Sequence, residues 1–367
     1  MKTRRHFSCS TFAALAILLG ATSHAMACTG IRLQAKDGTV VYARTMEFGI
    51  DLNSNPIIIP RNFALTGTTD SGKPGLSWES TYGVAGMNGL GLTLIADGVN
   101  EKGLAAGIFY LPGYAQYQQV ERGQESESLA PWELVTWILT NFATVEEVRD
   151  ALPRIKVANV VLDGAGFAPP LHYIVHDAAG NSLVVEYLHG TLSLHDNPIG
   201  VITNSPEFDW HVKNLSNYLN LTPLNAAPED LSGLKVSQLG QGTGLLGLPG
   251  DFTPPSRFVR AVVFSQAAVP VETGEEAVRQ AFHVLDSFDI PRGTVKAVES
   301  GKPSYEYTQW TAASDTQHRS YYFHSLDNRR VRRVDLLKAD LNSKHVLTMP
   351  LQQDEDIEDL TPRANGG

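Results

Sequence analysis

The sequence CTGIRLQAKDGTVVYARTM, residues 28–46, predicts two antiparallel strands joined by a tight turn. Both arms are rich in apolar and β-branched residues, and an Asp-Gly pair lies between them. Asp37-Gly38 supplies the positive φ that a two-residue hairpin loop requires. A loop of this length fixes the register of the whole hairpin, and it places Cys28 opposite Glu47.

The residues before Cys28 have the composition of an export signal. A basic start is followed by the apolar run TFAALAILLG, and AMA at residues 25–27 gives a small-x-small cleavage pattern. The apolar run is too short to span a bilayer, and no later run approaches that length. We therefore expect residues 1–27 to be a signal peptide and the protein to be exported, to the periplasm or the medium. TRRHF also fits a twin-arginine signal, so Sec and Tat export are equal alternatives.

Cleavage after Ala27 removes Cys9 and leaves Cys28 as the first residue of a chain of 367 − 27 = 340 residues. A chain with one cysteine forms no internal disulfide, so its stability must come from a hydrophobic core, which this length can bury. Three of the 29 basic residues and none of the 39 acidic residues are removed, so the net charge becomes 26 − 39 = −13. This acidity argues against nucleic acid and anionic membranes as partners.

Strands and helices occur in separate groups along the chain. LHYIVHDAAGNSLVVEYLHGTLSLHD, residues 171–196, predicts three short antiparallel strands, whereas APWELVTWILTNF, residues 130–142, predicts an amphipathic helix. Thr144 and Thr273 each precede a glutamate by three residues, which is the spacing of a helix capping box. Grouped strands and grouped helices favour an α+β fold.

The domain organisation is simple. The mature chain has no internal repeat and no linker rich in Pro, Gly or Ser. We therefore expect a single domain at residues 28–345. An acidic, apolar-poor tail follows at residues 346–367, and this composition predicts disorder.

A glycine-rich segment, LGQGTGLLGLPGDFTPPSRF at residues 239–258, contains the pattern GxGxxG. Dinucleotide binding needs a helix directly after this pattern, and here prolines follow instead. We interpret the segment as an irregular loop that delivers Ser256 and Arg257 to the start of a helix. The chain has no HExxH, GxSxG or Walker motif and no metal-spaced Cys/His cluster, so the sequence predicts no metal and no cofactor.

Cys28 is the strongest chemical signal in the chain. A free cysteine is usually a small buried hydrophobe, and a cysteine after a signal peptide can also carry a lipid. Lipidation normally needs leucine three residues before the cysteine, where Ala25 stands. The catalytic alternative is a nucleophile whose base is its own α-amine, because an amine pKa of about 8 and a thiol pKa of about 8.5 suit proton transfer near neutral pH. Signal cleavage would then create the base.

Two charged residues of the second strand are candidates for the surroundings of Cys28. The Glu47 carboxylate could hold the new α-amine, although an exposed acid at a strand end fits the spacing equally well. Arg44 has the opposite parity to Glu47, so a straight strand directs these two side chains to opposite faces. Both reach Cys28 only if a bulge or a strand end lies near Met46.

Five segments share the pattern of a known family: CTGIRL, RTMEF, GVNEKGLAAGIFYLPG, GVITNSPEFDWHVKNLSNY and GQGTGLLGLPGDFTPPSRF. Together they resemble the choloylglycine hydrolase family of linear-amide C–N hydrolases. This family contains conjugated bile salt hydrolases and penicillin V acylases, and its members are N-terminal-nucleophile hydrolases. The resemblance begins at Cys28 and covers nearly the whole mature chain.

The resemblance implies an αββα sandwich, in which two antiparallel sheets lie between helical layers. It assigns the nucleophile to Cys28 and active-site arginines to Arg44 and Arg257. The side-chain amide of Asn204 and the main-chain N–H of Tyr110 would form the oxyanion hole. Penicillin V acylases resemble this chain at Tyr110, where many bile salt hydrolases have asparagine.

Glu47 stands where the family usually has the aspartate that binds the α-amine. The resemblance implies a thioester mechanism, without metal or cofactor, on a small-molecule N-acyl amide. Penicillin V or N-acyl homoserine lactone acylase activity is the first expectation, and conjugated bile salt hydrolysis is the alternative. A lipid-anchored, non-catalytic binding protein is the alternative from another class. Since family members are commonly homotetramers, we also expect a homo-oligomer.

Overall fold

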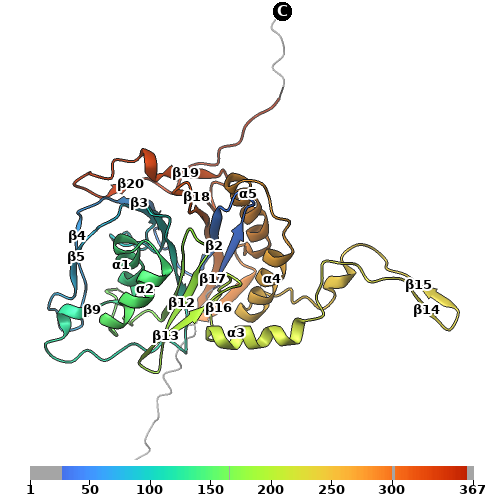
Figure 1. Ribbon diagram of the computed structural model, residues 1–367, viewed down its shortest axis with the longest axis horizontal. Helices are drawn as coiled ribbons and strands as arrows, with labels where there is room; N and C mark the ends of the chain where they lie inside the picture. Colours follow the sequence, from blue (N-terminus) through green and yellow to red (C-terminus); the bar gives the residue numbers. More distant parts are fainter. Residues whose placement is uncertain (1–26, 165, 300–301, 362–367) are drawn as a thin grey trace, which may run out of the picture.

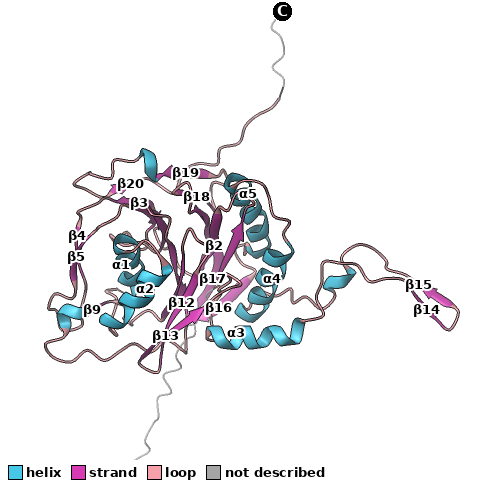
Figure 2. Ribbon diagram, in the orientation of Figure 1, coloured by secondary structure: helices cyan, strands magenta, loops and turns pink. Residues whose placement is uncertain are grey.

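The computed structural model describes residues 27–164, 166–299 and 302–361, and two β-sheets packed face to face form its centre (Figure 1). The predicted signal peptide lies outside the described residues, apart from Ala27. Figure 2 shows helices on both outer faces of the sheet pair. The fold is therefore the αββα sandwich that the family resemblance implied, and the α+β prediction is confirmed.

One sheet contains the N-terminal hairpin at its edge. Its strands run in the order β1-β2-β17-β18-β19, and β16 pairs with β17. The strand bounds are β1 (Cys28–Gln34), β2 (Val40–Phe48), β16 (Val295–Glu299), β17 (Lys302–Asp315), β18 (Ser320–Ser325) and β19 (Arg332–Asp335).

The second sheet has the order β13-β12-β11-β8-β7-β6-β3-β20. Its bounds are β3 (Pro56–Ile59), β6 (Val84–Met87), β7 (Asp97–Asn100), β8 (Ala105–Tyr110), β11 (Leu171–His176), β12 (Ser182–Leu188), β13 (Thr191–Asp196) and β20 (Leu347–Thr348). The three strands expected in residues 171–196 are β11, β12 and β13. Short pairs lie outside the sheets: β4 (Ala64–Thr66) with β5 (Ser77–Glu79), β9 (Ser128–Leu129) with β10 (Lys156–Val157), and β14 (Glu229–Leu231) with β15 (Leu234–Val236).

Helices cover the outer faces. Helix α1 packs on β7 and β8, whereas α4 and α5 pack on β1, β2 and β17. The helix bounds are α1 (Leu134–Asn141), α2 (Val145–Ala151), α3 (Phe208–Asn214), α4 (Pro254–Ala267) and α5 (Gly274–Leu285). Both predicted caps form, since the Thr144 and Thr273 side chains accept from the backbone N–H of the glutamates three residues later. Among the described residues, no helix has the length and apolar character needed to cross a membrane.

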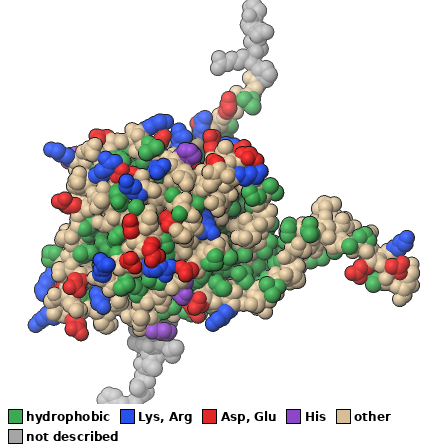
Figure 3. Space-filling model, in the orientation of Figure 1, with side chains coloured by type: hydrophobic (Ala, Val, Ile, Leu, Met, Phe, Trp, Pro, Cys, Tyr) green, Lys and Arg blue, Asp and Glu red, His purple; other side chains and the backbone are tan. Residues whose placement is uncertain are grey.

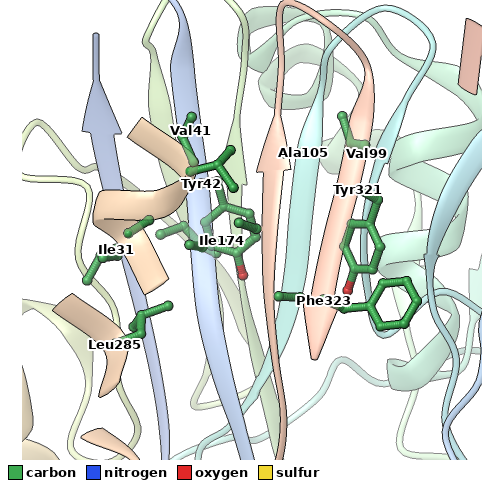
Figure 4. Packing of buried hydrophobic residues seen from close by; sticks show 14 of the residues in the cluster. Ile31, Val41, Tyr42, Val99, Ala105, Ile174, Leu285, Tyr321 and Phe323 are labelled. Carbon is green, nitrogen blue, oxygen red and sulfur yellow. The ribbon is translucent and has the colours of Figure 1, made fainter. Parts of the chain in front are cut away.

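The core extends over both faces of the first sheet, because β1 and β2 are buried on each side. Ile31 packs toward Leu285 of α5, whereas Tyr42 points between the sheets toward Ile174 (Figure 4). Gly30 allows the sheets to approach closely beside Cys28, since a Cβ there would lie 2.8 Å from Cζ of Phe109. β2 is buried along nearly its whole length, polar and charged residues included, because both of its faces are covered.

The register predicted for the first hairpin is wrong by one residue. Ala35 donates to the Thr39 carbonyl at 2.9 Å, so the loop has three residues and not two. Gly38 closes the loop at φ 89°, and the Asp37 carboxylate accepts from the Thr39 N–H at 2.9 Å. Cys28 consequently pairs with Met46, one position before Glu47. The irregularity expected near Met46 occurs in the neighbouring strand, between Thr308 and Trp310 of β17.

The chain stays within the fold beyond residue 345, where we placed the domain boundary. Strand β20 pairs with β3, and Leu351 is buried in the core between the helices and sheets. The predicted tail therefore begins too early, because Leu347, Met349 and Leu351 pack in or against the core, whereas Ile357 and Leu360 farther along are exposed.

Candidate active site

Cys28 begins β1 at the edge of the space between the two sheets, and its side chain is buried. Its Sγ lies 3.8 Å from Sδ of Met46 and 4.0 Å from the carbonyl oxygen of Glu47. The thiol borders an open cavity of about 130 Å³ whose lining is almost wholly apolar, including Phe48, Leu94, Ala96, Ile108, Tyr110 and Trp132. Burial raises the pKa of the Cys28 thiol, and the positive charge of Arg44 opposes this effect.

Asn204 connects Cys28 to the opposite sheet. Its Oδ1 accepts from the Cys28 nitrogen at 2.7 Å and from Nη2 of Arg257 at 2.7 Å. Both partners are donors, so this geometry fixes which side-chain atom of Asn204 is oxygen. Its Nδ2 donates one proton to the Tyr110 carbonyl at 2.9 Å, and the second proton of this amide remains for a ligand.

Arg257 enters the site from the first turn of α4, as expected for the end of the glycine-rich loop. It donates to the Cys28 carbonyl oxygen and, at 2.9 Å, to Oγ1 of Thr29. With its bond to Asn204, the guanidinium fixes the relative positions of three groups at the start of β1. The bonds of Arg257 go to the backbone and to the side chains of Thr29 and Asn204, so its observed role is positional.

Arg44 lies on the Cys28 face of the hairpin, fully buried between the sheets. Its guanidinium sits 4.2 Å above the Phe109 ring and donates to the Ile108 carbonyl. Its Nη2 is 3.6 Å from Sδ of Met46, the atom that also contacts the thiol. Arg44 therefore supplies positive charge beside the sulfur, which favours thiolate.

Glu47 is buried but does not contact the Cys28 nitrogen, which is still joined to Ala27 in this structure. Its Oε1 accepts from Oγ1 of Thr308 at 2.9 Å, and its Oε2 is buried without a hydrogen-bond partner among the described residues. Burial raises the pKa of Glu47 to about 7, and the charge of Arg257 opposes this effect. An unsatisfied buried carboxylate oxygen is costly, so Oε2 is a ready acceptor for a new donor.

The main-chain N–H of Tyr110, the predicted second oxyanion donor, lies at the end of β8. On the β7 side of β8, Ile108 donates to the Ala96 carbonyl at 2.8 Å. Groups two residues apart point to the same side, so the Tyr110 N–H also points there. Strand β7 begins only at Asp97, so its ladder does not extend to this N–H. Asn204 binds the carbonyl of the same residue, which brings the two predicted donors together.

Sequence analysis missed the groups that support these residues. Met46, Phe109 and Trp310 surround the Arg44 guanidinium, and Thr308 binds Glu47. Met46 and Phe109 lie inside two of the family-like segments, which was the one available signal. The described residues contain no group of three or more His, Cys, Asp or Glu side chains able to hold a metal ion.

Comparison with known proteins assigns the family. Residues 28–349 match the model of linear amide C–N hydrolases of the choloylglycine hydrolase family. The chain belongs to this family. It is 35% identical over 324 residues to a bile salt hydrolase/transferase of Clostridium perfringens, covering 88% of this chain and 96% of that protein.

Two solved structures of the family show the same architecture. A variant of the conjugated bile acid hydrolase from Clostridium perfringens superposes with a TM-score of 0.81 at 32% identity, covering 91% of this chain and all of that chain. Penicillin V acylase from Agrobacterium tumefaciens gives a TM-score of 0.70 at 27% identity, covering 89% of this chain and 92% of that chain. The chain is thus a hydrolase of linear amide bonds, and identity is higher to the bile salt enzymes than to the penicillin V acylase.

The burial of Glu47 predicts an unusual effect of pH on stability. Its pKa is about 7 in the fold and near 4.5 in the unfolded chain, so unfolding releases protons between these values and stability falls as pH rises through this window. We expect Glu47→Gln, in protein that retains Ala27, to gain up to about 3 kcal/mol at pH 8 and to change little at pH 4. Urea unfolding at both pH values measures this.

Glu101 provides the control of opposite sign. It accepts from Arg61 and from the Gly83 N–H, and these bonds outweigh burial and lower the pKa of this carboxyl. Glu101→Gln should therefore lose stability at pH 8. A similar loss in Glu47→Gln would show that the Glu47 carboxylate is stabilised in the fold, against this interpretation.

Proposed function

We propose that this protein is an exported cysteine amidohydrolase that cleaves N-acyl amides through a thioester on Cys28. The observation that carries the proposal is the position of the thiol, which borders an apolar cavity while the nitrogen of the same residue is bound to Asn204. Removal of residues 1–27 turns this nitrogen into an α-amine. The nucleophilic thiol and the base then belong to one residue, which lies beside the cavity that we assign to the acyl group.

In acylation, the sulfur of Cys28 attacks the amide carbonyl carbon and its proton moves to the α-amine. The developing oxyanion is stabilised by the second Nδ2 proton of Asn204 and by the Tyr110 N–H. Donors of this kind each contribute roughly 3 kcal/mol to transition-state stabilisation. The α-ammonium then protonates the leaving amine, which departs and leaves a thioester.

In deacylation, the same α-amine takes a proton from water, and the water oxygen attacks the thioester carbon. The C–S bond then breaks, the carboxylic acid leaves, and the α-ammonium returns its proton to the thiolate. The buried Oε2 of Glu47 is the acceptor that we assign to the ammonium form. Placing a cation beside this carboxylate would lower its pKa from about 7 and raise that of the amine.

The cavity supports an acyl group with one aromatic ring or a short aliphatic chain. An apolar cavity of about 150 Å³ in another protein stays dry and accommodates benzene, and the cavity beside Cys28 is about 130 Å³. Phenoxyacetyl and aliphatic acyl amides, as in penicillin V and N-acyl homoserine lactones, therefore rank first. The likeness to a penicillin V acylase supports the same choice.

Conjugated bile salts are the second candidate, and the 35% identity to a bile salt hydrolase/transferase favours them. A steroid acyl group is much larger than the cavity of about 130 Å³, so part of it would lie outside the cavity opening. The lipid-anchored alternative is disfavoured, because Ala25 stands where lipidation normally needs leucine, three residues before Cys28.

Product analysis tests the proposal. Purified protein with a mass-verified Cys28 N-terminus is incubated with penicillin V, an N-acyl homoserine lactone and glycocholate, and the released amines are quantified. We expect the highest kcat/KM with the first or second substrate. Dominant glycocholate hydrolysis would transfer the assignment to the bile salt type, and no hydrolysis of any of them would refute the amidase proposal.

We further propose that the protein assembles into a homo-oligomer through the arm that carries β14 and β15. Figures 1 and 3 show this arm projecting from the body with apolar side chains on its surface. Its leucines are strongly exposed, among them Leu231, Leu234 and Leu239. Replacing these three by serine should convert the oligomer into a monomer in sedimentation velocity. A wild-type protein that already sediments as a monomer would contradict the proposal.

A further inference from the structure

Two histidines hold the backbone on either side of the Asn204 side chain. His172 of β11 places Nε2 3.0 Å from the Thr203 carbonyl oxygen, and His211 of α3 places Nε2 2.8 Å from the carbonyl oxygen of Asn204. A carbonyl oxygen only accepts, so both Nε2 atoms carry a proton. Both histidines are buried, at 1% and 2% exposure, so water does not compete for these bonds.

Glu186 of β12 binds His172 and the first residue of the helix that carries His211. Its Oε1 lies 3.0 Å from Nδ1 of His172 and 3.0 Å from the backbone nitrogen of Phe208. Phe208 is the first residue of α3, the helix that carries His211. One carboxylate, with no exposed surface, therefore ties together the two ends of the segment 203–208 that contains Asn204.

Both ring nitrogens of His172 face an oxygen, Oε1 of Glu186 and the carbonyl oxygen of Thr203. Burial acts to raise the pKa of Glu186, but its interactions with His172 and with His195, whose Nε2 lies 3.4 Å from Oε2, outweigh burial and lower this pKa to about 2. His211 is neutral near pH 7, because burial lowers its pKa to about 4, and its ring stacks on Phe258 at 4.7 Å between centroids.

We infer that Glu186, His172 and His211 are positioning residues for the oxyanion donor Asn204, an inference that rests on the proposed function. The Asn204 amide must face the carbonyl oxygen of the substrate, and small displacements of such a donor are costly in rate. The side chain of Asn204 is oriented by Cys28, Arg257 and Tyr110. The three positioning residues fix the backbone from which that side chain extends.

Glu186→Gln tests the inference, since glutamine keeps the size and removes the carboxylate that lies 3.0 Å from Nδ1 of His172. Loss of a hydrogen bond involving a charged group predicts a fall in kcat of about 10- to 100-fold, with KM within about threefold of wild type. His211→Phe keeps the stack on Phe258 and removes the donor to Asn204, and it should lower kcat by roughly tenfold. Glu101→Gln is the matched control, a carboxylate that also accepts from a backbone N–H and a cation, and its kcat should stay at the wild-type value.

Hydrogen exchange of the Phe208 amide, followed by NMR, reports on the cluster without any substrate. We expect at least about tenfold faster exchange in Glu186→Gln. Unchanged exchange, an unchanged kcat, or an equal fall of kcat in Glu101→Gln would each overturn the inference. If Glu186→Gln does not fold, the kcat of His211→Phe tests the inference instead, and a wild-type kcat in that variant would overturn it. A wild type inactive on all three substrates removes the proposed function, while Phe208 exchange still tests whether Glu186 holds the segment.

Discussion

Cys28→Ser is expected to lower kcat for amide hydrolysis by at least about 10³-fold with the fold unchanged. A serine hydroxyl is far less acidic than a thiol, so the α-amine is a poor match as its base. Asn204 and Arg257 bind the nitrogen and the carbonyl oxygen of residue 28, so the substitution leaves these bonds and the neighbouring cavity in place. Substrate binding should therefore persist while turnover is lost. Steady-state kinetics and substrate titration measure the two effects separately.

The serine variant requires two controls. Mass spectrometry must show that its N-terminus is residue 28, because a signal peptidase that fails on the variant would also abolish activity. Circular dichroism and thermal unfolding must match the wild type. A correctly processed, folded Cys28→Ser protein with near-wild-type turnover would falsify the assignment of the nucleophile.

Retention of Ala27 should lower kcat by about 10²- to 10⁴-fold, which is the usual contribution of general acid–base catalysis. An amide nitrogen cannot take a proton near neutral pH, and in this structure the Cys28 nitrogen, still joined to Ala27, uses its single proton to donate to Asn204. Ala27 is itself accommodated, with 3% of its surface exposed. The loss would therefore come from the missing base, since the retained residue fits the fold.

The experiment compares protein with an extension that ends in Ala27 with the same protein after a specific protease has exposed Cys28. Activity should appear on cleavage, in proportion to the fraction of free N-terminus seen by mass spectrometry. Full activity of the extended protein before cleavage would rule out the α-amine as the base, although Cys28 could still be the nucleophile.

Much of the fold was predictable because its determinants are local. The hairpin of residues 28–46, the three strands in 171–196 and the capped helices follow from alternation, turn residues and capping boxes that act within a few residues. The loop length of the first hairpin was not predictable from Asp37-Gly38 alone. The Asp37 carboxylate binds both the Thr39 N–H inside the loop and the N–H of Gly274, far away in the chain.

The stacking of the two sheets, in contrast, could not be predicted from local sequence patterns. β2 is buried on both faces, yet its second half contains Arg44, Thr45 and Glu47, so its sequence does not show that both faces are covered. The αββα architecture entered through the family resemblance, and the structure shows the packing that underlies it. Gly30 is the clearest case, since its missing side chain matters only because Phe109 of the other sheet lies against it.

By itself, the sequence singled out Cys28 as the candidate nucleophile, since a predicted cleavage pattern ends directly before this cysteine. The segments that resemble the family identified four further candidate site residues, Arg44, Tyr110, Asn204 and Arg257. Only the tertiary structure decided how these residues meet, because Asn204 and Arg257 reach Cys28 across 176 and 229 residues of chain. It also decided that Glu47 is buried with a free oxygen and that Glu186 anchors the Asn204 segment. Hydrogen bonds of this range depend on how sheets and helices stack, and no local periodicity encodes that arrangement.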